Sequence, residues 1–409
     1  MNDAAIVGRV LREYHLRGIE PSALRRVGGA VASGAVTYLV GVHETTPWVV
    51  RAWREDTPVP VQASGGAAMT MLDWLMAQAG TLDCLEAAGY PAPRVIRTHS
   101  GDPVGLDGAW LTLATSFVEG PVIRPSLAQL RMLGEALGRL HALDVAGEPG
   151  GGAAGERGGR LAGERGGGLA GEPGRASWYP EAAIPATLAR LDAVEALVPE
   201  ELRDLYAELR QTTLTVQAGL SSLPRGMVHG DAWPGNAVQS GPDTVTLIDW
   251  ETGGLGLPVL DLGTCLIESL LDAQPSGSGA AVPGPGVPGP VASGPGVPRS
   301  RPAAWLVEPD EDRIAAVAQG YASQRVVGAA ERALLPAAVR FGACYVGAIH
   351  LHQALAEGVR GASMEARLQR LRNRVSVSEA VANLAVPHLA GGTELADGAD
   401  FAGGAETVR

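Results

Sequence analysis

The 409-residue sequence contains no lysine, so all 32 of its basic residues are arginines. It has only three cysteines, Cys84, Cys265 and Cys344, which lie far apart and form no CxxC pair. This pattern fits a reducing compartment and argues against a disulfide framework or a zinc site. No apolar run approaches the ~18 residues that a membrane span needs, and no basic segment followed by an apolar one opens the sequence. We therefore expect a cytoplasmic protein without a signal peptide or a membrane partner.

Charge is scarce as well, because Asp, Glu, Lys and Arg make up only 19% of the chain, against 46% for hydrophobic residues. This composition is typical of a globular protein, and the length is sufficient for two lobes and a large core. The net charge of -12 argues against a nucleic-acid partner, since nucleic-acid binding requires a basic stripe. We make no prediction of the oligomeric state.

Glycine and proline, by contrast, are abundant, with 56 and 29 copies that concentrate in two segments. In residues 146–176 the triplet Ala-Gly-Glu recurs every eight residues among Gly and Arg, and residues 275–302 consist mainly of Pro, Gly, Ser, Val and Ala. Neither segment has enough apolar surface to offset the entropy of ordering. We expect both to be disordered insertions on the surface, and residues 389–409 to form a flexible tail.

Deleting residues 150–172 or 278–298, with a short Gly-Ser bridge, is therefore expected to leave the melting temperature almost unchanged. The physical reason is that segments with few large apolar residues bury little surface and contribute little to stability. Thermal unfolding of the two deletion variants beside the full chain measures this. A loss of many degrees in either variant would show that the deleted segment packs on the core.

Polar residues with phosphoryl-transfer chemistry gather in one stretch, H-G-D-x-x-x-x-N followed by I-D-W-E. Asp231 precedes Asn236 by five residues, and Asp249 follows thirteen residues later at the end of an apolar run. Transfer from a magnesium nucleotide needs one carboxylate for the acceptor proton, and an amide and a second carboxylate for the metal. Protein kinases use the same Asp-to-Asn interval. A turn, a cap and a strand end would each explain one of these residues, but the joint spacing favours the catalytic interpretation.

These residues resemble those of the aminoglycoside phosphotransferase and choline kinase superfamily, small-molecule kinases with a protein-kinase-like fold. The resemblance implies an α+β, two-lobed fold, and ATP and Mg2+ as cofactors. It also implies that Asp231 is the catalytic base, that Asn236 and Asp249 are metal ligands, and that His229 is a scaffold of the loop. Asp261 matches a family residue that looks structural and braces this loop.

The same resemblance divides the chain into a β-rich nucleotide-binding lobe, residues 1–117, and a mostly helical catalytic and substrate lobe, residues 118–388. Residues 117–120 would be the hinge between the lobes. Apolar periodicity predicts strands at 48–53 and 110–117, and an N-terminal helix at 3–16. Further helices are expected at about 67–88, 127–143, 185–197, 200–218, 259–272, 310–326, 330–357 and 363–385.

A glycine-rich turn between two expected strands within residues 24–42 contains Gly28, Gly29, Ser33 and Gly34. Glycines allow main-chain N–H groups to approach phosphate oxygens, although hairpins of this kind are also common without a ligand. The turn lies roughly 200 residues before the catalytic loop, where the family has its nucleotide loop. The resemblance therefore favours a nucleotide-binding role for these four residues.

Arg51 lies on the next strand, where the family places a basic residue, often Lys, that holds the α- and β-phosphates. Arginine binds phosphate through paired hydrogen bonds, and a solvent-facing arginine is the alternative. The family residue that pairs with this basic group falls on Gln78, which we also assign to the nucleotide site. An Arg51–Gln78 contact would be a hydrogen bond without a countercharge, which is the clearest departure from the family pattern.

The sequence thus predicts ATP- and Mg-dependent transfer of the γ-phosphate to a hydroxyl of a small molecule. One alternative is a protein kinase, which Gly230, in place of the protein-kinase arginine, and the lack of an Asp-Phe-Gly to Ala-Pro-Glu span both oppose. The other is a nucleotide-binding pseudokinase or scaffold, which the missing countercharge motivates and the intact Asp231, Asn236 and Asp249 oppose. Aminoglycoside-like, choline-like and other acceptors are not distinguished by the sequence.

Overall fold

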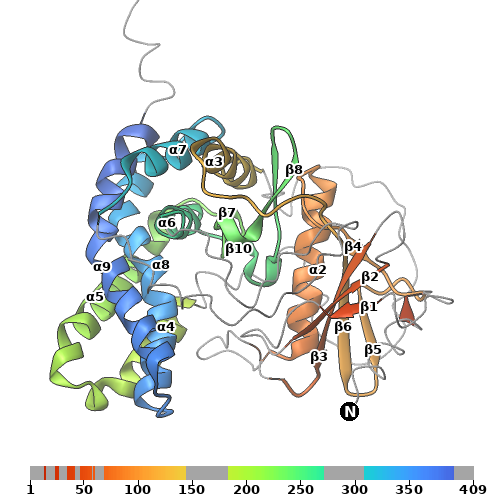
Figure 1. The fold of residues 1–409 in the computed structure, drawn as a ribbon, viewed down its shortest axis with the longest axis horizontal. Coiled ribbons are helices and arrows are strands. Elements are labelled where there is room, and N and C mark those ends of the chain that lie inside the picture. Colours follow the sequence, from red (N-terminus) through yellow and green to blue (C-terminus); the bar gives the residue numbers. More distant parts are fainter. Residues whose placement is uncertain are drawn as a thin grey trace, which may run out of the picture.

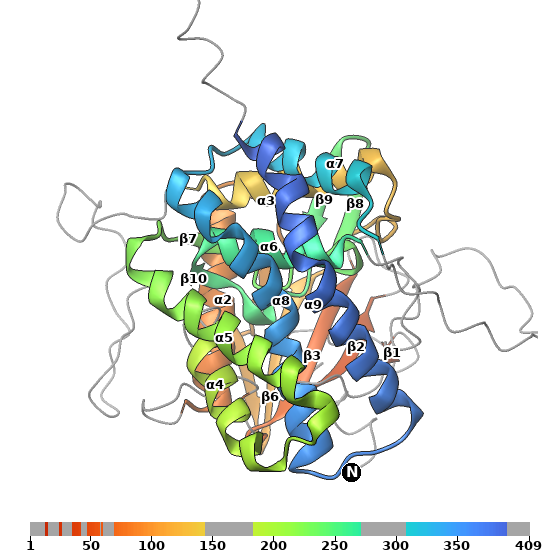
Figure 2. The same cartoon turned by 90° about the vertical axis from the view of Figure 1, so that its left-hand side faces the viewer.

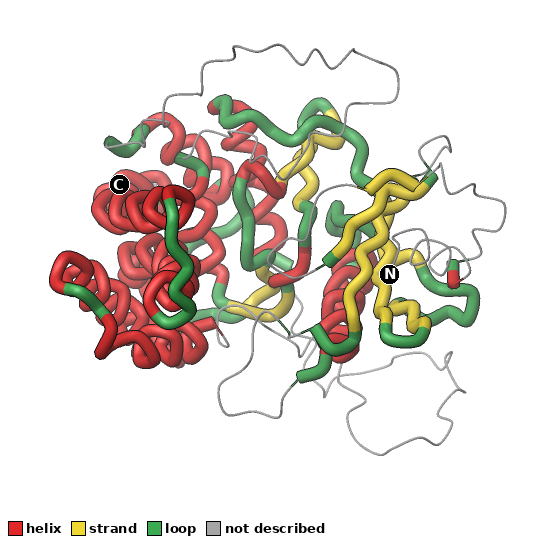
Figure 3. The backbone as a smooth tube through the Cα atoms, turned by 60° about the horizontal axis from the view of Figure 1, so that its bottom comes forward, coloured by secondary structure: helices red, strands yellow, loops and turns green. Residues whose placement is uncertain are grey.

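The computed structural model describes residues 13–14, 24–26, 35–41, 47–57, 59, 69–143, 183–270 and 308–390. These residues form two lobes, one built on a sheet and one almost entirely of helices (Figure 1). The tube view separates them, with the strands of the sheet on one side and most helices on the other (Figure 3). This is the α+β, two-lobed arrangement expected from the sequence.

The small lobe is an antiparallel sheet with one helix, α2 (Met71–Ala87), packed beside it. A capping box between Thr70 and Asp73 fixes the start of α2. The strand order is β1 (Leu24–Arg26), β2 (Val36–Val40), β3 (Trp48–Arg54), β6 (Trp110–Ser116) and β4 (Val95–Ile96), with β5 (Val104–Asp107) paired to β6.

Side-chain alternation along β3 decides where Arg51 lies. Val50 and Ala52 are fully buried on one face, so the period of two places Arg51 on the other face together with Trp53. Trp53 meets Trp74 of α2 edge to face, with ring centroids 5.9 Å apart. Arg51 therefore lies on the face of the sheet that α2 covers.

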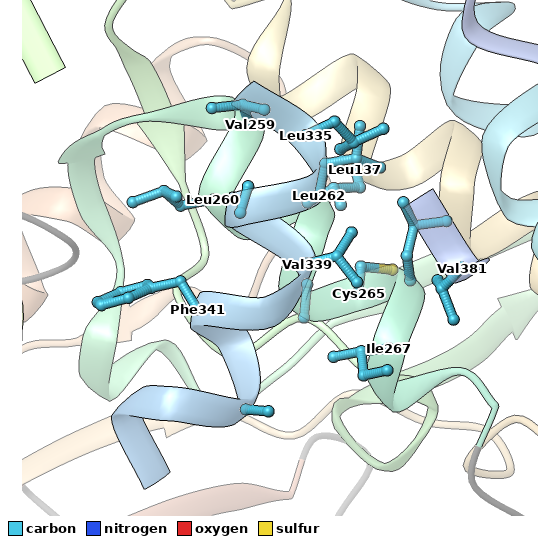
Figure 4. Close-up of a cluster of buried hydrophobic side chains, with 14 of the residues drawn as sticks. Leu137, Val259, Leu260, Leu262, Cys265, Ile267, Leu335, Val339, Phe341 and Val381 are labelled. Atoms are coloured by element: carbon cyan, nitrogen blue, oxygen red, sulfur yellow. The ribbon is translucent and has the colours of Figure 1, made fainter. Parts of the chain in front are cut away.

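The large lobe is built around α6 (Pro258–Glu268), nearly all of whose residues are buried. Its side chains interlock with those of α8 and α9, as in the cluster around Leu262, Cys265 and Val339 (Figure 4). Figure 2 shows α4, α5, α8 and α9 as a layer on the outer side of this lobe. The remaining helices are α3 (Leu127–His141), α4 (Ala183–Val194), α5 (Arg203–Gly219), α7 (Glu311–Ala322), α8 (Ala329–Leu355) and α9 (Ala362–Leu389).

Two glycines allow α3 and α7 to cross in close contact. A Cβ added at Gly134 would lie 2.1 Å from the carbonyl oxygen of Val317, and one added at Gly320 would lie 2.1 Å from that of Arg131. Any larger residue at either position would force the backbones apart. The crossing fixes α7, which follows the second insertion, against α3, which precedes the first.

Four short strands frame the loop that carries the motif residues. β7 (Gly226–Val228) pairs with β10 (Gly254–Gly256), and β8 (Ala237–Gly241) pairs with β9 (Thr244–Leu247). The segment between the lobes is held against this frame by a bridge between Val122 and Val238. The frame thus connects the large lobe to the end of the sheet, where β6 stops at Ser116.

α8 is long and apolar enough to cross a membrane, and within the described residues it is the one helix that meets this test. More than half of its apolar window is buried, and it packs against α4, α5, α6 and α9. Such burial is typical of the core helix of a globular lobe.

The predicted helices agree with the observed ones to within about four residues at each end, α9 included. α9 continues past Pro387 to Leu389, because Ala385 and Leu389 are buried and α9 packs on α7 there. Most of the predicted helix at 3–16, the glycine-rich turn and the two insertions fall outside the described residues.

Candidate active site

The loop after β7 carries His229 and Asp231, and its shape depends on a neutral histidine. His229 is fully buried, and its Nε2 lies 2.9 Å from the carbonyl oxygen of Ile248. Its Nδ1 accepts a hydrogen bond from the Asp231 backbone N–H at 3.3 Å. These bonds require a proton on Nε2 and none on Nδ1, and burial lowers the pKa of His229, which favours this form. His229 is therefore a scaffold of the loop, and its side chain holds Asp231 in place.

Asp261, on the first turn of α6, braces the same loop. Its two oxygens accept hydrogen bonds from the backbone N–H groups of His229, at 2.6 Å, and Gly230, at 3.1 Å. Burial alone would raise the pKa of Asp261, but hydrogen bonds and the nearby histidines outweigh it and lower this pKa. The carboxylate thus stays ionised and satisfies two N–H groups that would otherwise be buried without partners. This is the bracing role expected of Asp261.

A chain of buried polar groups continues from Asp261 into the large lobe. His141 Nε2 lies 3.1 Å from Asp261, and His141 Nδ1 lies 2.8 Å from the Tyr321 hydroxyl. Arg325 donates to the same hydroxyl at 3.0 Å and forms an ion pair with Glu331 at 2.9 Å. Burial lowers the pKa of His141, which again favours the neutral ring. His141 is thus a core histidine.

Asp231 lies at the centre of the motif and is hydrogen-bonded to Asn236. The Asn236 side-chain N–H2 donates to the Asp231 carboxylate at 2.7 Å and to its backbone carbonyl at 3.0 Å. Burial, followed by the charges of Asp249 and Glu268, raises the pKa of Asp231 well above its usual value. A carboxylate with a raised pKa accepts a proton more readily, which suits a general base.

Asp249 is held in a backbone conformation that non-glycine residues rarely adopt. Its φ is 68° and its ψ is 61°, and among the described residues it is the one non-glycine with positive φ. The preceding Ile248 donates its backbone N–H to the Asn236 carbonyl at 2.9 Å, which joins the segments that carry Asn236 and Asp249. Left-handed backbone at a polar residue is a form of local strain that concentrates at functional sites.

Arg51 reaches from the small lobe to this turn. Its Nη1 donates to Asp249 at 2.7 Å and to Glu251 at 2.8 Å, and the Arg51 side chain is 26% exposed. Burial would lower the pKa of Arg51, but the two carboxylates outweigh this and raise it, so the guanidinium stays charged. Glu251 belongs to the I-D-W-E stretch, yet the sequence alone assigned it no role.

The structure does not pair Arg51 with Gln78. Gln78 lies on α2 and is only 3% exposed, and no hydrogen bond joins it to Arg51. Its Nε2 is buried and has no hydrogen-bond partner. The countercharge that Gln78 lacks comes instead from Asp249 and Glu251 of the other lobe. Gly28, Gly29, Ser33 and Gly34 lie outside the described residues.

A family model described as "Phosphotransferase enzyme family" matches residues 30–285, which include every described motif residue named above. The chain belongs to this family. It is also 26% identical, over 282 residues, to a homoserine kinase of Acidiphilium cryptum, a match that covers 66% of this chain and 67% of that protein.

Solved structures of kinases share the fold. An amicoumacin kinase in complex with AMP-PNP, Ca2+ and Ami is 14% identical with a TM-score of 0.57, over 93% of this chain and 94% of that one. A microcompartment-associated aminopropanol kinase is 18% identical with a TM-score of 0.56, over 94% and 99% of the two chains. These structures confirm the protein-kinase-like fold predicted from the sequence. The predicted enzyme class, a small-molecule kinase, is supported by the family match and by the homoserine kinase relative.

Proposed function

We propose that the protein transfers the γ-phosphate of Mg-ATP to a hydroxyl group of a small molecule, with Asp231 as the catalytic base. The observation that carries this proposal is the hydrogen bond between Asp231 and Asn236, at 2.7 Å, beside the left-handed turn at Asp249. It supports a site in which a proton acceptor and two metal ligands act together.

In the proposed reaction the acceptor hydroxyl oxygen forms a bond to the γ-phosphorus as the bond from that phosphorus to the β–γ bridging oxygen breaks. The hydroxyl proton passes to the Asp231 carboxylate, and ADP is the leaving group. Asp231 is suited to this role because His229 holds its backbone N–H and Asn236 holds its carboxylate. Positioning of this kind supplies much of the catalysis in phosphoryl transfer.

The side chains present fit a magnesium nucleotide. Asn236 uses its N–H2 group for Asp231, so its amide oxygen, which makes no hydrogen bond within the described residues, remains for a metal. Asp249 would supply the second oxygen. Among the described residues no cluster of three or more His, Cys, Asp or Glu surrounds a metal position. This suits Mg2+, which binds one or two protein groups together with phosphate oxygens and, when bound, neutralises charge on the phosphates.

Arg51 would hold the phosphates with the part of its guanidinium that the carboxylates leave open. Nη1 makes both bonds to Asp249 and Glu251, while Nε and Nη2 make no hydrogen bond within the described residues. A guanidinium has five N–H donors in a fixed fork, so it can bind two carboxylates and a phosphate together.

Arg51→Ala is expected to weaken Mg-ATP binding by roughly 1.5–3 kcal/mol, the value of hydrogen bonds to a charged group. Glu251→Gln should weaken it less, because Asp249 still orients the guanidinium. Isothermal titration calorimetry of Mg-ATP measures both. Arg54→Ala is the matched control, since Arg54 is on the same strand, 57% exposed, and paired only with Asp56. Equal affinity in Arg51→Ala and Arg54→Ala would remove Arg51 from the phosphate site.

The experiment that tests the function itself is ADP release, measured with Mg-ATP over a panel of hydroxylated metabolites and antibiotics. Turnover of at least one acceptor that is lost in Asp231→Asn is the expected result. Binding of Mg-ATP without turnover of any acceptor would favour a nucleotide-binding pseudokinase. The cytoplasmic location and the small-molecule partner remain parts of this proposal.

A further inference from the structure

Arginines of α4 and α9 act on the part of α8 that extends beyond the end of α6. α6 packs along α8 through Gly263 and Thr264, which contact Ala338 and Gly342, and it ends at Glu268. The next turns of α8 carry Tyr345, Ile349 and His350, which are all partly exposed. α4 and α9 both pack on α8.

Arg190 lies on α4, which packs on α8, and its charge acts on Tyr345 together with that of Asp231. Burial raises the pKa of the Tyr345 hydroxyl, the positive charge of Arg190 lowers it, and the negative charge of Asp231 raises it. Both charges therefore act on one phenol group. The Nη1 of Arg190 is buried and donates no hydrogen bond. A buried donor without an acceptor is costly, and an anionic oxygen is the partner that a guanidinium binds most strongly.

α9 supplies three more arginines, Arg367, Arg370 and Arg374, whose spacing of three and four residues places them on one face of the helix. Burial, and then the positive charges of these three arginines, lower the pKa of His350 on α8 to about 4. The same charges, after burial, lower the pKa of Arg370. Every charge that acts on His350 is thus positive.

This basic group is connected to the catalytic centre through one carboxylate. Arg374 forms an ion pair with Glu268 at 2.7 Å, and the two side chains are 18% and 13% exposed. The negative charge of Glu268 in turn raises the pKa of Asp231. Arg374 Nε is buried and has no hydrogen-bond partner, and Arg367 makes no ion pair or hydrogen bond within the described residues. Arg367 and Arg374 thus keep N–H donors beyond the ion pair with Glu268.

We propose that the phosphate acceptor carries an oxyanionic group, a carboxylate or a phosphate, which Arg190 and the α9 arginines Arg367 and Arg374 bind near Asp231. The inference rests on the proposed function, since it names the acceptor class of the same site. The anionic group would be held by the arginines while the hydroxyl of the same molecule lies at Asp231. A polycationic acceptor such as an aminoglycoside is disfavoured, because like charges would be brought together in a partly desolvated place.

The test is steady-state kinetics with Mg-ATP and matched acceptors. The probes are L-homoserine and D-glycerate beside their carboxamides, glycerol 3-phosphate beside glycerol, and the cations aminopropanol and spectinomycin. We expect at least one anionic probe to exceed its neutral partner by about 100-fold or more in kcat/KM, with the carboxylate and phosphate pairs identifying the group bound. Arg190→Gln should lower kcat/KM for that anion by about 10- to 100-fold, the scale of a charged hydrogen bond, and leave its neutral partner unchanged.

Arg190→Lys, which keeps the charge, should recover part of the loss, and a thermal melt confirms that each variant is folded. Arg372→Gln is the matched control on α9, because Arg372 donates to the Glu201 carbonyl and its charge is not among those that lower the pKa of His350. Preference for a cation or a neutral probe would overturn the anionic acceptor and leave the kinase function standing. Mg-ATP binding in calorimetry without turnover of any anionic probe would also count against it, whereas no Mg-ATP binding at all would refute the proposed function first.

Discussion

Asp231→Asn is expected to lower the turnover number by ~10²–10⁴, the usual contribution of a general base. An asparagine is nearly the same size and can still accept the hydrogen bond that Asn236 donates at 2.7 Å, so the loop should keep its shape. The amide cannot take a proton from the acceptor. Chemistry should therefore fail while the nucleotide still binds.

Single-turnover kinetics and calorimetry with Mg-ATP separate these two effects. Asp243→Asn is a suitable control, because Asp243 is an exposed residue of the turn between β8 and β9. Turnover in Asp231→Asn within threefold of the wild type would remove Asp231 from the catalytic role. A loss of Mg-ATP affinity as large as the loss of turnover would point to a structural role instead.

Asp261→Ala is expected to reduce the free energy of unfolding by about 3–5 kcal/mol, and to reduce activity with it. The substitution leaves the N–H groups of His229 and Gly230 and the Nε2 of His141 without their shared acceptor. Each buried donor left unpaired costs about 1–3 kcal/mol. Because the loop carries Asp231, the damage should reach the catalytic centre as well.

Urea unfolding at several pH values measures this effect. The pKa of Asp261 is lowered in the folded protein, so its contribution is complete above its ordinary pKa of about 3.9 and is lost as the pH falls through the lowered value. The gap between wild type and Asp261→Ala should thus be constant from about pH 5 to 8 and narrow only below about pH 4. Asp243→Ala, an exposed control, should change stability by about 0.5 kcal/mol or less. A similarly small effect in Asp261→Ala would show that the loop is held by other contacts.

The helices were predictable because each has a long apolar periodicity that packing on the core preserves. The strands around the motif were harder, since β7 and β10 have three residues each and include several glycines, too short for an alternating pattern. α9 continues beyond residue 385, where the sequence predicted its end, because Leu389 is buried. Pro387 lies in the last turn and does not end the helix.

In the site, the motif residues lay close together in sequence, and their spacing carried the chemistry. The partners of Arg51 could not be predicted in this way. Asp249 and Glu251 are 198 and 200 residues away in the sequence, and only the fold brings them to Arg51. The resemblance instead suggested Gln78, which occupies the family position without its charge. The arginines of α9 had a visible signal in their helical spacing, but nothing in the sequence placed Arg374 against Glu268 of α6.

The contact of Arg51 with Asp249 and Glu251 adds a charged connection to the apolar one between the lobes, where Tyr90 packs edge to face on Trp250 and donates to the Ala136 carbonyl. The charged connection is only partly shielded from solvent, with side chains 26%, 35% and 20% exposed. Dissolved salt screens such pairs, with a Debye length of about 8 Å at physiological ionic strength. Raising the ionic strength should therefore weaken the hold of Arg51 on the Asp249 turn while the buried contact of Tyr90 persists, so that salt distinguishes the two kinds of contact between the lobes.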